Sequence, residues 1–331
     1  MENNWNAAKL IKNLRPMYVK EIIFEYTDED NFLTVGEISD KLVENYGITV
    51  TRQTLYDDID MLISAGYDIE CVKGRMNKYH VLSRDFDNAE LRILIDSVES
   101  MQSLPRDQAN SLIRKIARLG GPSADYLMQT VNVDGRPRSD NTQIKYIIDT
   151  VYKAILKNRQ IAFKYYEHLT STEKVLKNNG KEYKISPYRL VSCNNYYYLL
   201  GLPDDSKKVM IFRVDRISGI PAILKMNCRP EPDTLYINRY IKETFHMKGG
   251  EAAEIVLTFD GEVMDAMVDR FGQDMEITHI NKSEYRAKVN VQVNNIFFAW
   301  VFGFEGKVRI SAPASVQTQY IKMISKEMAR L

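Results

Sequence analysis

A polar segment divides the sequence into two parts of different character. The segment NVDGRPRSDN, residues 132–141, combines glycine, proline and charges of both signs, which is typical of a linker. Helical periodicity dominates the residues before it, whereas the residues after it begin with one helix and continue in short strand-like runs. A chain of 331 residues, at roughly 100–200 residues per domain, is then expected to hold two or three domains rather than one.

The first part of the chain carries the start and stop signals of helices. Pro16 stands at a first-turn position and opens a predicted helix, PMYVKEIIFEYT. A second predicted helix starts at Thr34, with Glu37 three residues on as in a capping box, and it ends at Gly47. After a three-residue turn, Thr51 is the predicted cap of a third helix, TRQTLYDDIDMLISAG.

A predicted hairpin completes this domain, which we assign to residues 1–85. Residues 67–83 alternate between apolar and polar side chains around Gly74. Two short helices joined by a tight turn and followed by a hairpin are the order of a winged helix-turn-helix, which places a helix in the major groove and the hairpin on the backbone or in the minor groove. A double-stranded DNA operator is therefore the predicted partner. The alternative is a small helical domain that makes protein contacts.

The predicted DNA contacts are polar side chains at the start of the third helix and cations in the hairpin. Arginine reads guanine and glutamine reads adenine through paired hydrogen bonds in the major groove. Asp57, Asp58 and Asp60 follow in the same helix, where carboxylates repel phosphate, and residues 1–85 hold 10 basic against 15 acidic residues. The predicted set is Thr51, Arg52, Gln53, Thr54, Tyr56, Lys73, Arg75 and Lys78.

Residues 86–141 are predicted to form a helical connector that ends in the linker. The runs DNAELRILIDSVESMQ and RDQANSLIRKIARLGG are amphipathic, and Pro105 separates them. We interpret this pair of helices as a spacer with some dimer contact.

The remaining residues predict two further domains. Residues 142–225 contain a helix and then QIAFKYYEH, KEYKISPYRLVSC, YYYLLGLP and KVMIFRVDRI, short strands whose close spacing predicts a small antiparallel barrel. In residues 226–331, strands and helices follow in the order βαββαβ with a trailing helix, which predicts a ferredoxin-like α+β domain. The whole chain is therefore predicted to be a multidomain α+β protein.

Positive charge is concentrated in the predicted barrel, although the whole chain carries only +1. Residues 141–225 hold 15 Lys and Arg against 7 Asp and Glu, whereas residues 250–331 hold 9 against 11. Tyrosines interleave with these cations, and bases stack on aromatic faces while cations contact phosphates. The barrel is thus the predicted site for a polyanion. A basic surface that serves only solubility is the alternative.

Three short motifs in this region resemble the WYL-domain family of bacterial regulators. They are ISPYRLV at 185–191, YYLLG at 197–201 and FRVDRI at 212–217. Tyr197 takes the place of the family's tryptophan, and Met210 stands where the family often has a basic residue. The resemblance extends to the domains on both sides. It implies an Sm-like, SH3-type barrel that senses single-stranded DNA, RNA or small oligonucleotides, in a transcriptional regulator that is commonly homodimeric and often encoded near phage-defence or stress-response genes.

The predicted ligand contacts are tyrosines, a histidine and cations of the barrel. In a continuous strand only alternate residues share a face, so Tyr197 and Tyr198 point in opposite directions and one of them belongs to the core. By the same rule Arg213 and Asp215 share a face, where they can form an ordinary surface ion pair. The predicted set is Tyr166, His168, Tyr188, Arg189, Tyr198, Arg213 and Arg216.

No pattern in the sequence points to catalysis, a metal or a membrane span. The histidines and the cysteines Cys71, Cys193 and Cys228 form no ligand or nucleophile motif, so we predict no enzyme activity, no metal and no cofactor. The N-terminus is polar, and no apolar run approaches the roughly 20 residues of a membrane span. Together with the scattered, odd number of cysteines, these features predict a cytoplasmic protein.

These predictions combine into two hypotheses for function. The first is a homodimeric, DNA-binding transcriptional regulator whose operator affinity changes when the barrel binds a nucleic-acid or nucleotide ligand. The second is an RNA- or single-stranded-DNA-binding accessory protein that modulates a nucleic-acid-processing effector, for example in phage defence. In that case the acidic N-terminal domain would be an interaction module, and a reporter-repression assay would separate the two hypotheses.

Overall fold

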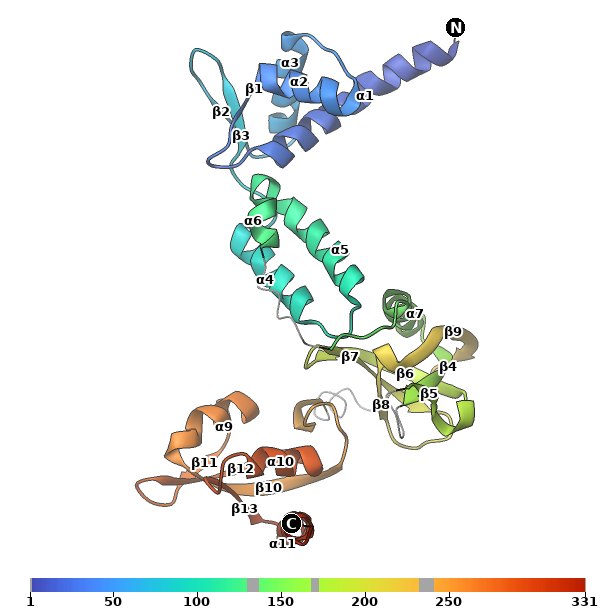
Figure 1. Cartoon of the computed structure of the whole chain (residues 1–331), viewed down its shortest axis with the longest axis vertical. Coiled ribbons are helices and arrows are strands. Elements are labelled where there is room, and N and C mark those ends of the chain that lie inside the picture. The colour runs from blue at the N-terminus through green and yellow to red at the C-terminus, as the bar shows by residue number, and fades with distance from the viewer. Residues whose placement is uncertain (1, 130–136, 168–172, 232–240, 331) are drawn as a thin grey trace. The chain divides into compact units, whose positions relative to one another are not determined.

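The chain folds into two compact units, Met1–Thr142 and Gln143–Leu331, each of which is described by itself. The computed structural model describes residues 2–129, 137–167, 173–231 and 241–330, without the side chains of residues 2–12 (Figure 1). Both units combine helices with antiparallel sheets, so the chain is a multidomain α+β protein, as the sequence predicts.

Three helices and a hairpin open the first unit in the predicted order, and a short strand that was not predicted adds to the hairpin to form a small antiparallel sheet. The elements are α1 (Glu2–Tyr26), β1 (Leu33–Thr34), α2 (Val35–Tyr46), α3 (Arg52–Ser64), β2 (Ile69–Val72) and β3 (Lys78–Val81). The strand order is β1-β3-β2. The helices meet in one core, which includes Val19, Ile22, Leu42, Leu55 and Ile59.

Helix α1 does not begin at Pro16, so the prediction was wrong on this point. The helix starts at Glu2 and contains Pro16 in its interior. A proline removes one backbone hydrogen bond and crowds the preceding turn, but the residues before it, AAKLIKNL, are mostly good helix formers. The helix therefore continues on both sides of the proline.

Side-chain caps define the ends of α2 and the start of α3 as the sequence predicts. The Thr34 N–H donates to Glu37 Oε2 at 2.7 Å and the Glu37 N–H donates to Thr34 Oγ1 at 3.3 Å, which completes the capping box. The hydrogen bonds from Thr34 lower the pKa of the Glu37 carboxyl. At the other end of α2, Gly47 adopts φ +65°, which favours glycine. Thr51 caps α3 by accepting a hydrogen bond from the Thr54 N–H.

The two predicted helices of the connector are present and are followed by a third, short one. The elements are α4 (Asn88–Ser100), α5 (Arg106–Ala117), a 3-10 helix (Arg118–Ser123) and α6 (Ala124–Met128). Of the predicted linker, residues 132–136 lie outside the described residues. Its later part is held to the connector, because Arg138 donates hydrogen bonds to the carbonyls of Glu99 and Met101 near the end of α4.

The 3-10 helix brings Gly121 to a place where a side chain does not fit. Gly121 has φ +59° and ψ −123° and lies beside Arg84, which donates to the carbonyls of Phe24 and Thr27 at 2.7 and 2.6 Å. A Cβ at Gly121 would lie 2.5 Å from the Phe24 carbonyl oxygen and 2.4 Å from Arg84 Nη2. We expect Gly121→Ala to destabilise the first unit by about 1–3 kcal/mol in urea unfolding. Gly74→Ala, where the nearest atom is 3.6 Å away, is the control, and equal stability of the two variants would contradict this expectation.

A helix and a curled antiparallel sheet open the second unit (Figure 1). The elements are α7 (Ile144–Leu156), β4 (Arg159–Glu167), β5 (Val175–Leu176), β6 (Tyr183–Cys193), β7 (Tyr196–Pro203), β8 (Met210–Arg213) and β9 (Ile217–Asn227). The strand order is β5-β4-β6-β7-β8, and β9 pairs with β4. Among the described strand pairs β8 pairs only with β7, so these pairs form a curled sheet rather than a closed barrel.

Aromatic rings fill the core of this sheet. Phe163, Tyr165, Tyr183 and Phe212 pack together, and every pair of their ring centroids lies 5.3–6.4 Å apart. Several of these pairs are edge-to-face, the arrangement that the ring quadrupoles favour. Part of the tyrosine content of this basic region therefore serves the core.

The run IFRVDRI is not one continuous strand, so the predicted alternation of faces fails there. Strand β8 ends at Arg213, a 3-10 turn covers Val214–Arg216, and β9 starts at Ile217. The chain has to turn because β8 pairs with β7, whereas Ile217 pairs with Tyr165 of β4. As a result Val214 and Asp215 are both buried, although they are neighbours.

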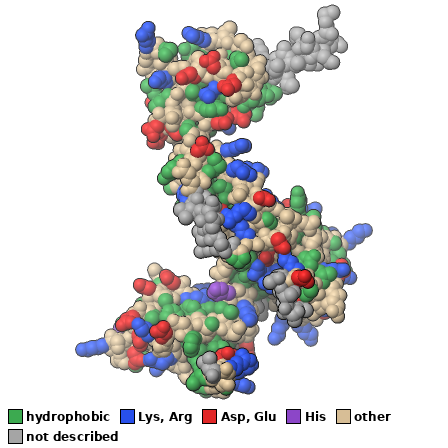
Figure 2. Space-filling view, in the orientation of Figure 1, with side chains coloured by type: hydrophobic (Ala, Val, Ile, Leu, Met, Phe, Trp, Pro, Cys, Tyr) green, Lys and Arg blue, Asp and Glu red, His purple; other side chains and the backbone are tan. Residues whose placement is uncertain are grey.

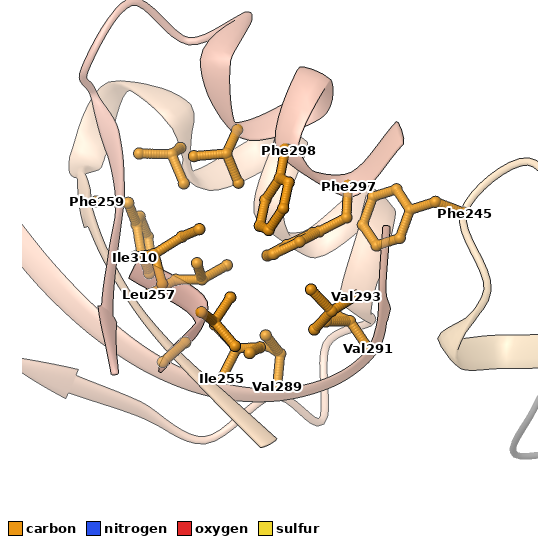
Figure 3. Packing of buried hydrophobic residues seen from close by; sticks show 14 of the residues in the cluster. Phe245, Ile255, Leu257, Phe259, Val289, Val291, Val293, Phe297, Phe298 and Ile310 are labelled. Atoms are coloured by element: carbon orange, nitrogen blue, oxygen red, sulfur yellow. The ribbon is translucent and has the colours of Figure 1, made fainter. Parts of the chain in front are cut away.

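The last part of the second unit has the predicted order of strands and helices. The elements are β10 (Glu251–Asp260), α9 (Met264–Phe271), β11 (Ile277–His279), β12 (Glu284–Val293), α10 (Asn295–Phe302), β13 (Val308–Ala312) and α11 (Ala314–Met328). The strand order is β11-β12-β10-β13, with all described pairs antiparallel. Figure 3 shows Phe297 and Phe298 of α10 facing Leu257 and Val291 of the sheet, with Phe245 beside Phe297.

Candidate nucleic-acid interfaces

The start of α3 exposes part of the predicted DNA-reading set. Arg52 and Gln53 are both exposed, but Gln53 Nε2 donates to Asp57 Oδ1, one helical turn further on, at 3.0 Å. The hydroxyls of Thr51 and Thr54 lie 2.9 Å apart, and Thr51 also accepts from the Thr54 N–H. Both threonines therefore serve the helix cap, and Arg52 is the member of the set that is most available to a base.

The hairpin after α3 exposes the three predicted cations. Lys73, Arg75 and Lys78 are exposed on the β2–β3 turn and at the start of β3. Tyr56, by contrast, is partly buried and packs against the helical core. Figure 2 shows acidic and basic side chains interspersed over the visible face of this domain, so that face is not uniformly basic. A DNA contact here would depend on the few exposed cations that are close together in sequence.

Asp58 belongs to a buried ion pair and does not face solvent. Its side chain is 2% exposed and accepts hydrogen bonds from Arg15 of α1, from Nε at 2.5 Å and from Nη2 at 2.9 Å. Hydrogen bonding to Asp58, opposed by burial, raises the pKa of the Arg15 guanidinium. The pair joins α1 to α3, whereas Asp57 and Asp60 of the same helix are exposed.

In the curled sheet, Arg213 lies at the end of β8 and is bound to Asp215. Its Nε donates to Asp215 Oδ1 at 3.1 Å and its Nη2 to Oδ2 at 2.7 Å, so the ion pair considered from the sequence is present. Burial lowers the pKa of Arg213, but the hydrogen bonds and charge of Asp215 outweigh this effect and the pKa is raised. The Arg213 backbone N–H donates to the Tyr165 hydroxyl at 2.9 Å, and burial raises the pKa of Tyr165 to about 12.

Tyr196 is a contact of Arg213 that the sequence analysis missed. The guanidinium carbon lies 3.6 Å from the centroid of the Tyr196 ring, which is a cation–π contact. Alternation in β7 places Tyr196 on the same face as Tyr198, and the β7–β8 register pairs Tyr198 with Arg213. A predicted register for these two strands could therefore have identified Tyr196 as a contact of Arg213. Tyr198 is only 8% exposed and packs with Tyr188, which confirms that one of Tyr197 and Tyr198 belongs to the core.

Two predicted ligand residues lie at a cavity of about 400 Å³ that Arg213 does not line. Arg189 Nη2 pairs with Glu231 Oε1 at 2.8 Å, and the Tyr188 hydroxyl donates to the carbonyl of Pro230 at 3.1 Å. Burial raises the pKa of the Tyr188 hydroxyl. The cavity is also lined by Ile155, Asn158, Pro187, Cys228 and Arg229.

The remaining predicted ligand residues are less engaged. Tyr166 is partly buried in the β4–β5 pair, and His168 lies outside the described residues. Arg216 is partly exposed, and its side chain forms no hydrogen bond or ion pair within the described part of the chain. The structure thus divides the predicted ligand set between Arg213 with Tyr196 and the cavity beside Tyr188.

No described group of three or more His, Cys, Asp or Glu side chains could hold a metal ion. A search of the described helices also finds none that is both long and apolar enough to span a bilayer.

Residues from α7 to β9 form a small antiparallel β domain with an aromatic core and an arginine–carboxylate pair, within a multidomain α+β protein. Residues 146–221 match the sequence model of the WYL domain, so the chain contains a WYL domain. The three motifs noted in the sequence lie in this range, which confirms the resemblance.

Two solved structures are similar to the chain at low identity. The proteasome accessory factor B/C (PafBC) of Arthrobacter aurescens is 17% identical with a TM-score of 0.30, over 88% of this chain and 45% of that chain, so this chain spans less than half of that protein. A CRISPR Cas-related protein is 14% identical with a TM-score of 0.38, over 97% of this chain and 85% of that chain. At these values neither likeness carries an argument about function. No curated protein matches the sequence.

Proposed function

We propose that the chain is a DNA-binding transcriptional regulator whose WYL domain binds a nucleic-acid or nucleotide ligand and so changes its affinity for an operator. One observation carries this proposal: a WYL domain is joined to an N-terminal domain that exposes Arg52 at the start of α3 and three cations on the following hairpin. A WYL domain suggests a regulatory, DNA-binding protein, and this arrangement offers the side chains for a DNA contact.

The domain assignments follow from the order of elements. Helices α2 and α3, separated by residues 47–51 and followed by the β2–β3 hairpin, support a winged helix-turn-helix. The strand order β11-β12-β10-β13 supports a ferredoxin-like C-terminal domain. We assign the winged helix-turn-helix, the connector, the WYL domain and the C-terminal domain to residues 1–85, 86–141, 142–225 and 226–331. Dimerisation through the connector and the C-terminal domain would let two copies read a pseudo-palindromic operator.

The charge and the rings of the WYL domain support a single-stranded nucleic acid or a nucleotide as the ligand. The net charge of +8 in residues 141–225 attracts polyanions, and Arg213 on Tyr196 places a cation beside an aromatic face. The three cysteines are free thiols, which suits the reducing cytoplasm in which such a regulator would act.

Arg52→Ala is expected to weaken binding to the cognate operator by about 1–3 kcal/mol and to relax the base preference at one position, because arginine reads guanine with two hydrogen bonds. Gln53→Ala is expected to act in the same direction, although Gln53 must first leave Asp57 to reach a base. Footprinting on the native promoter, with purified full-length protein, measures both effects.

Lys78→Ala provides the comparison, since Lys78 is exposed on the hairpin and we expect it to contact a phosphate rather than a base. It should weaken binding to all duplexes alike and flatten the dependence of affinity on salt. If Arg52→Ala and Gln53→Ala leave the footprint unchanged, α3 does not contact the bases, and the proposal that this helix recognises an operator is contradicted.

A further inference from the structure

A tight turn at Phe245–Lys248 has an unusual backbone. Phe245 and Lys248 form an antiparallel bridge, and the Lys248 N–H donates to the Phe245 carbonyl at 2.9 Å. The two central residues, His246 and Met247, have φ +48° and +53°. Turns with positive φ at both central residues are dominated by glycine, asparagine and aspartate, so a methionine at this position is strained. Such a turn persists only when contacts of its side chains hold it.

One side of the turn is held by the C-terminal domain. The Phe245 ring is buried in that core, with its centroid 5.3 Å from Phe297 and 5.7 Å from Trp300 (Figure 3). The guanidinium carbon of Arg270 lies 3.9 Å from the Phe245 centroid, and Arg270 Nη2 donates to the Thr244 carbonyl at 3.3 Å. This half of the turn is therefore anchored.

The other side of the turn reaches into the WYL domain. Met247 is 6% exposed and packs with Tyr188, Tyr198 and Leu200 in one buried cluster. The two tyrosines are 3% and 8% exposed, so a base can stack on their rings only after a neighbouring side chain of this cluster moves away. A thioether side chain packs well on aromatic rings, and so does a nucleobase. Methionine and base would thus compete for the same aromatic surface.

The position of Arg213 fits a base at the Met247 site. Tyr198 is the Cα partner of Arg213 in the β7–β8 ladder. A base that replaced Met247 beside Tyr198 would therefore bring its phosphate toward the Arg213 guanidinium. Cation and aromatic surface are the two elements that single-stranded nucleic acids use.

We propose that Met247 is a built-in occupant of the base-stacking site of the WYL domain, and that a nucleobase of the ligand displaces it. The proposal rests on the proposed function, in that the ligand is a single-stranded nucleic acid or nucleotide. When Met247 leaves, the strained turn relaxes and the C-terminal domain loses its side-chain contact with Tyr188 and Tyr198. Ligand binding to the WYL domain thereby weakens the attachment of the C-terminal domain to it.

The test uses the full-length chain and a fluorescein-labelled single-stranded oligothymidylate. Met247→Gly removes the occupant and suits the positive φ, so we expect the oligonucleotide to bind about tenfold more tightly. Met247→Asn also suits the turn and cannot fill the apolar site, so it should act in the same direction. Met247→Leu keeps an apolar occupant and should bind like the wild type. The matched control is Met226→Ala, a methionine of β9 that is 49% exposed, which should change nothing.

A second measurement follows Met247 in the wild-type chain while the ligand binds. With ¹³C-methyl-labelled methionine, the Met247 methyl signal, assigned by its loss in Met247→Leu, should be shifted by the two tyrosine rings and should move toward an unshifted position when oligothymidylate is added. If the wild type binds but neither Met247→Gly nor the methyl signal responds, this proposal is overturned and the proposed function stands. If wild type and Met247→Gly both fail to bind, the nucleic-acid ligand and this proposal fall together.

Discussion

Arg213→Ala is expected to bind short single-stranded oligonucleotides roughly tenfold to a hundredfold more weakly than the wild-type chain. The substitution removes a charge-assisted hydrogen-bond donor, a loss of about 1.5–3 kcal/mol. It also removes the cation that packs on Tyr196 at 3.6 Å. Fluorescence anisotropy of labelled strands, titrated with full-length protein at several salt concentrations, measures the loss.

The control is Arg159→Ala, which removes the same charge from β4 of the same domain. Arg159 donates to the Lys225 carbonyl and to Asn227 Oδ1, both at 2.6 Å, and lies outside the predicted ligand set. It should leave affinity close to that of the wild type. A melting curve must accompany Arg213→Ala, because Asp215 is buried. Wild-type affinity in a folded Arg213→Ala variant would remove Arg213 from the ligand site.

A substitution of Asp215 is expected to change the affinity for the oligonucleotide in the opposite direction, because the Asp215 carboxylate competes with the ligand for the Arg213 guanidinium. In Asp215→Asn the side chain keeps its shape and loses its charge, so the oligonucleotide should bind more tightly than to the wild type. The effect of salt should also become steeper, because more positive charge then meets the phosphates.

Arg15→Ala is expected to have the largest effect on stability, a loss of about 3–5 kcal/mol in the first unit, because it leaves the buried carboxylate of Asp58 without its cation. Asp58 is 2% exposed and Arg15 supplies two hydrogen bonds to it across α1 and α3. Hydrogen exchange of peptides from α2 and α3, measured by mass spectrometry on the full-length chain, reports the loss locally.

The double substitution Arg15→Met with Asp58→Leu tests the cause. Apolar replacements leave no charge buried, so the double variant should be far more stable than Arg15→Ala. Arg52→Ala, an exposed position in α3, should change exchange little. If the double variant is as unstable as Arg15→Ala, the unpaired buried carboxylate does not explain the loss.

Local signals predicted the ends of several elements well. Thr34, Glu37 and Gly47 mark the limits of α2 because each acts on backbone groups within a few residues. Pro16 misled the prediction because its effect depends on the helical strength of the residues on both sides. The succession of strands and helices along residues 251–328 was readable for the same reason, since apolar alternation is itself local, whereas β5 and the separate strand β9 of the curled sheet were not predicted.

Contacts between distant residues could not be predicted from local patterns. Arg15 and Asp58 are 43 positions apart, and although helical spacing places Asp58 on the face of Leu55 and Leu62, no local pattern identifies Arg15 as its partner. The break after Arg213 depends on β8 and β9 pairing with different strands, which is a property of the sheet. For the same reason, the sequence motifs suggested Tyr188 and Tyr198 as ligand contacts, and only the packing shows that both lie in a buried cluster with Met247.

The setting of Arg213 also has an entropic consequence. A free arginine side chain loses up to about 2 kcal/mol of rotamer freedom when it is fixed. Arg213 is fixed before any ligand arrives, because its guanidinium carbon lies 3.6 Å from the Tyr196 ring centroid and its Nε and Nη2 donate to Asp215. Most of this loss of rotamer freedom therefore occurs on folding rather than on ligand binding. The guanidinium nitrogen that does not donate to Asp215, Nη1, is then held in one position. A lysine here would carry the same charge without the flat face or the fork, so Arg213→Lys should behave more like Arg213→Ala than like the wild type.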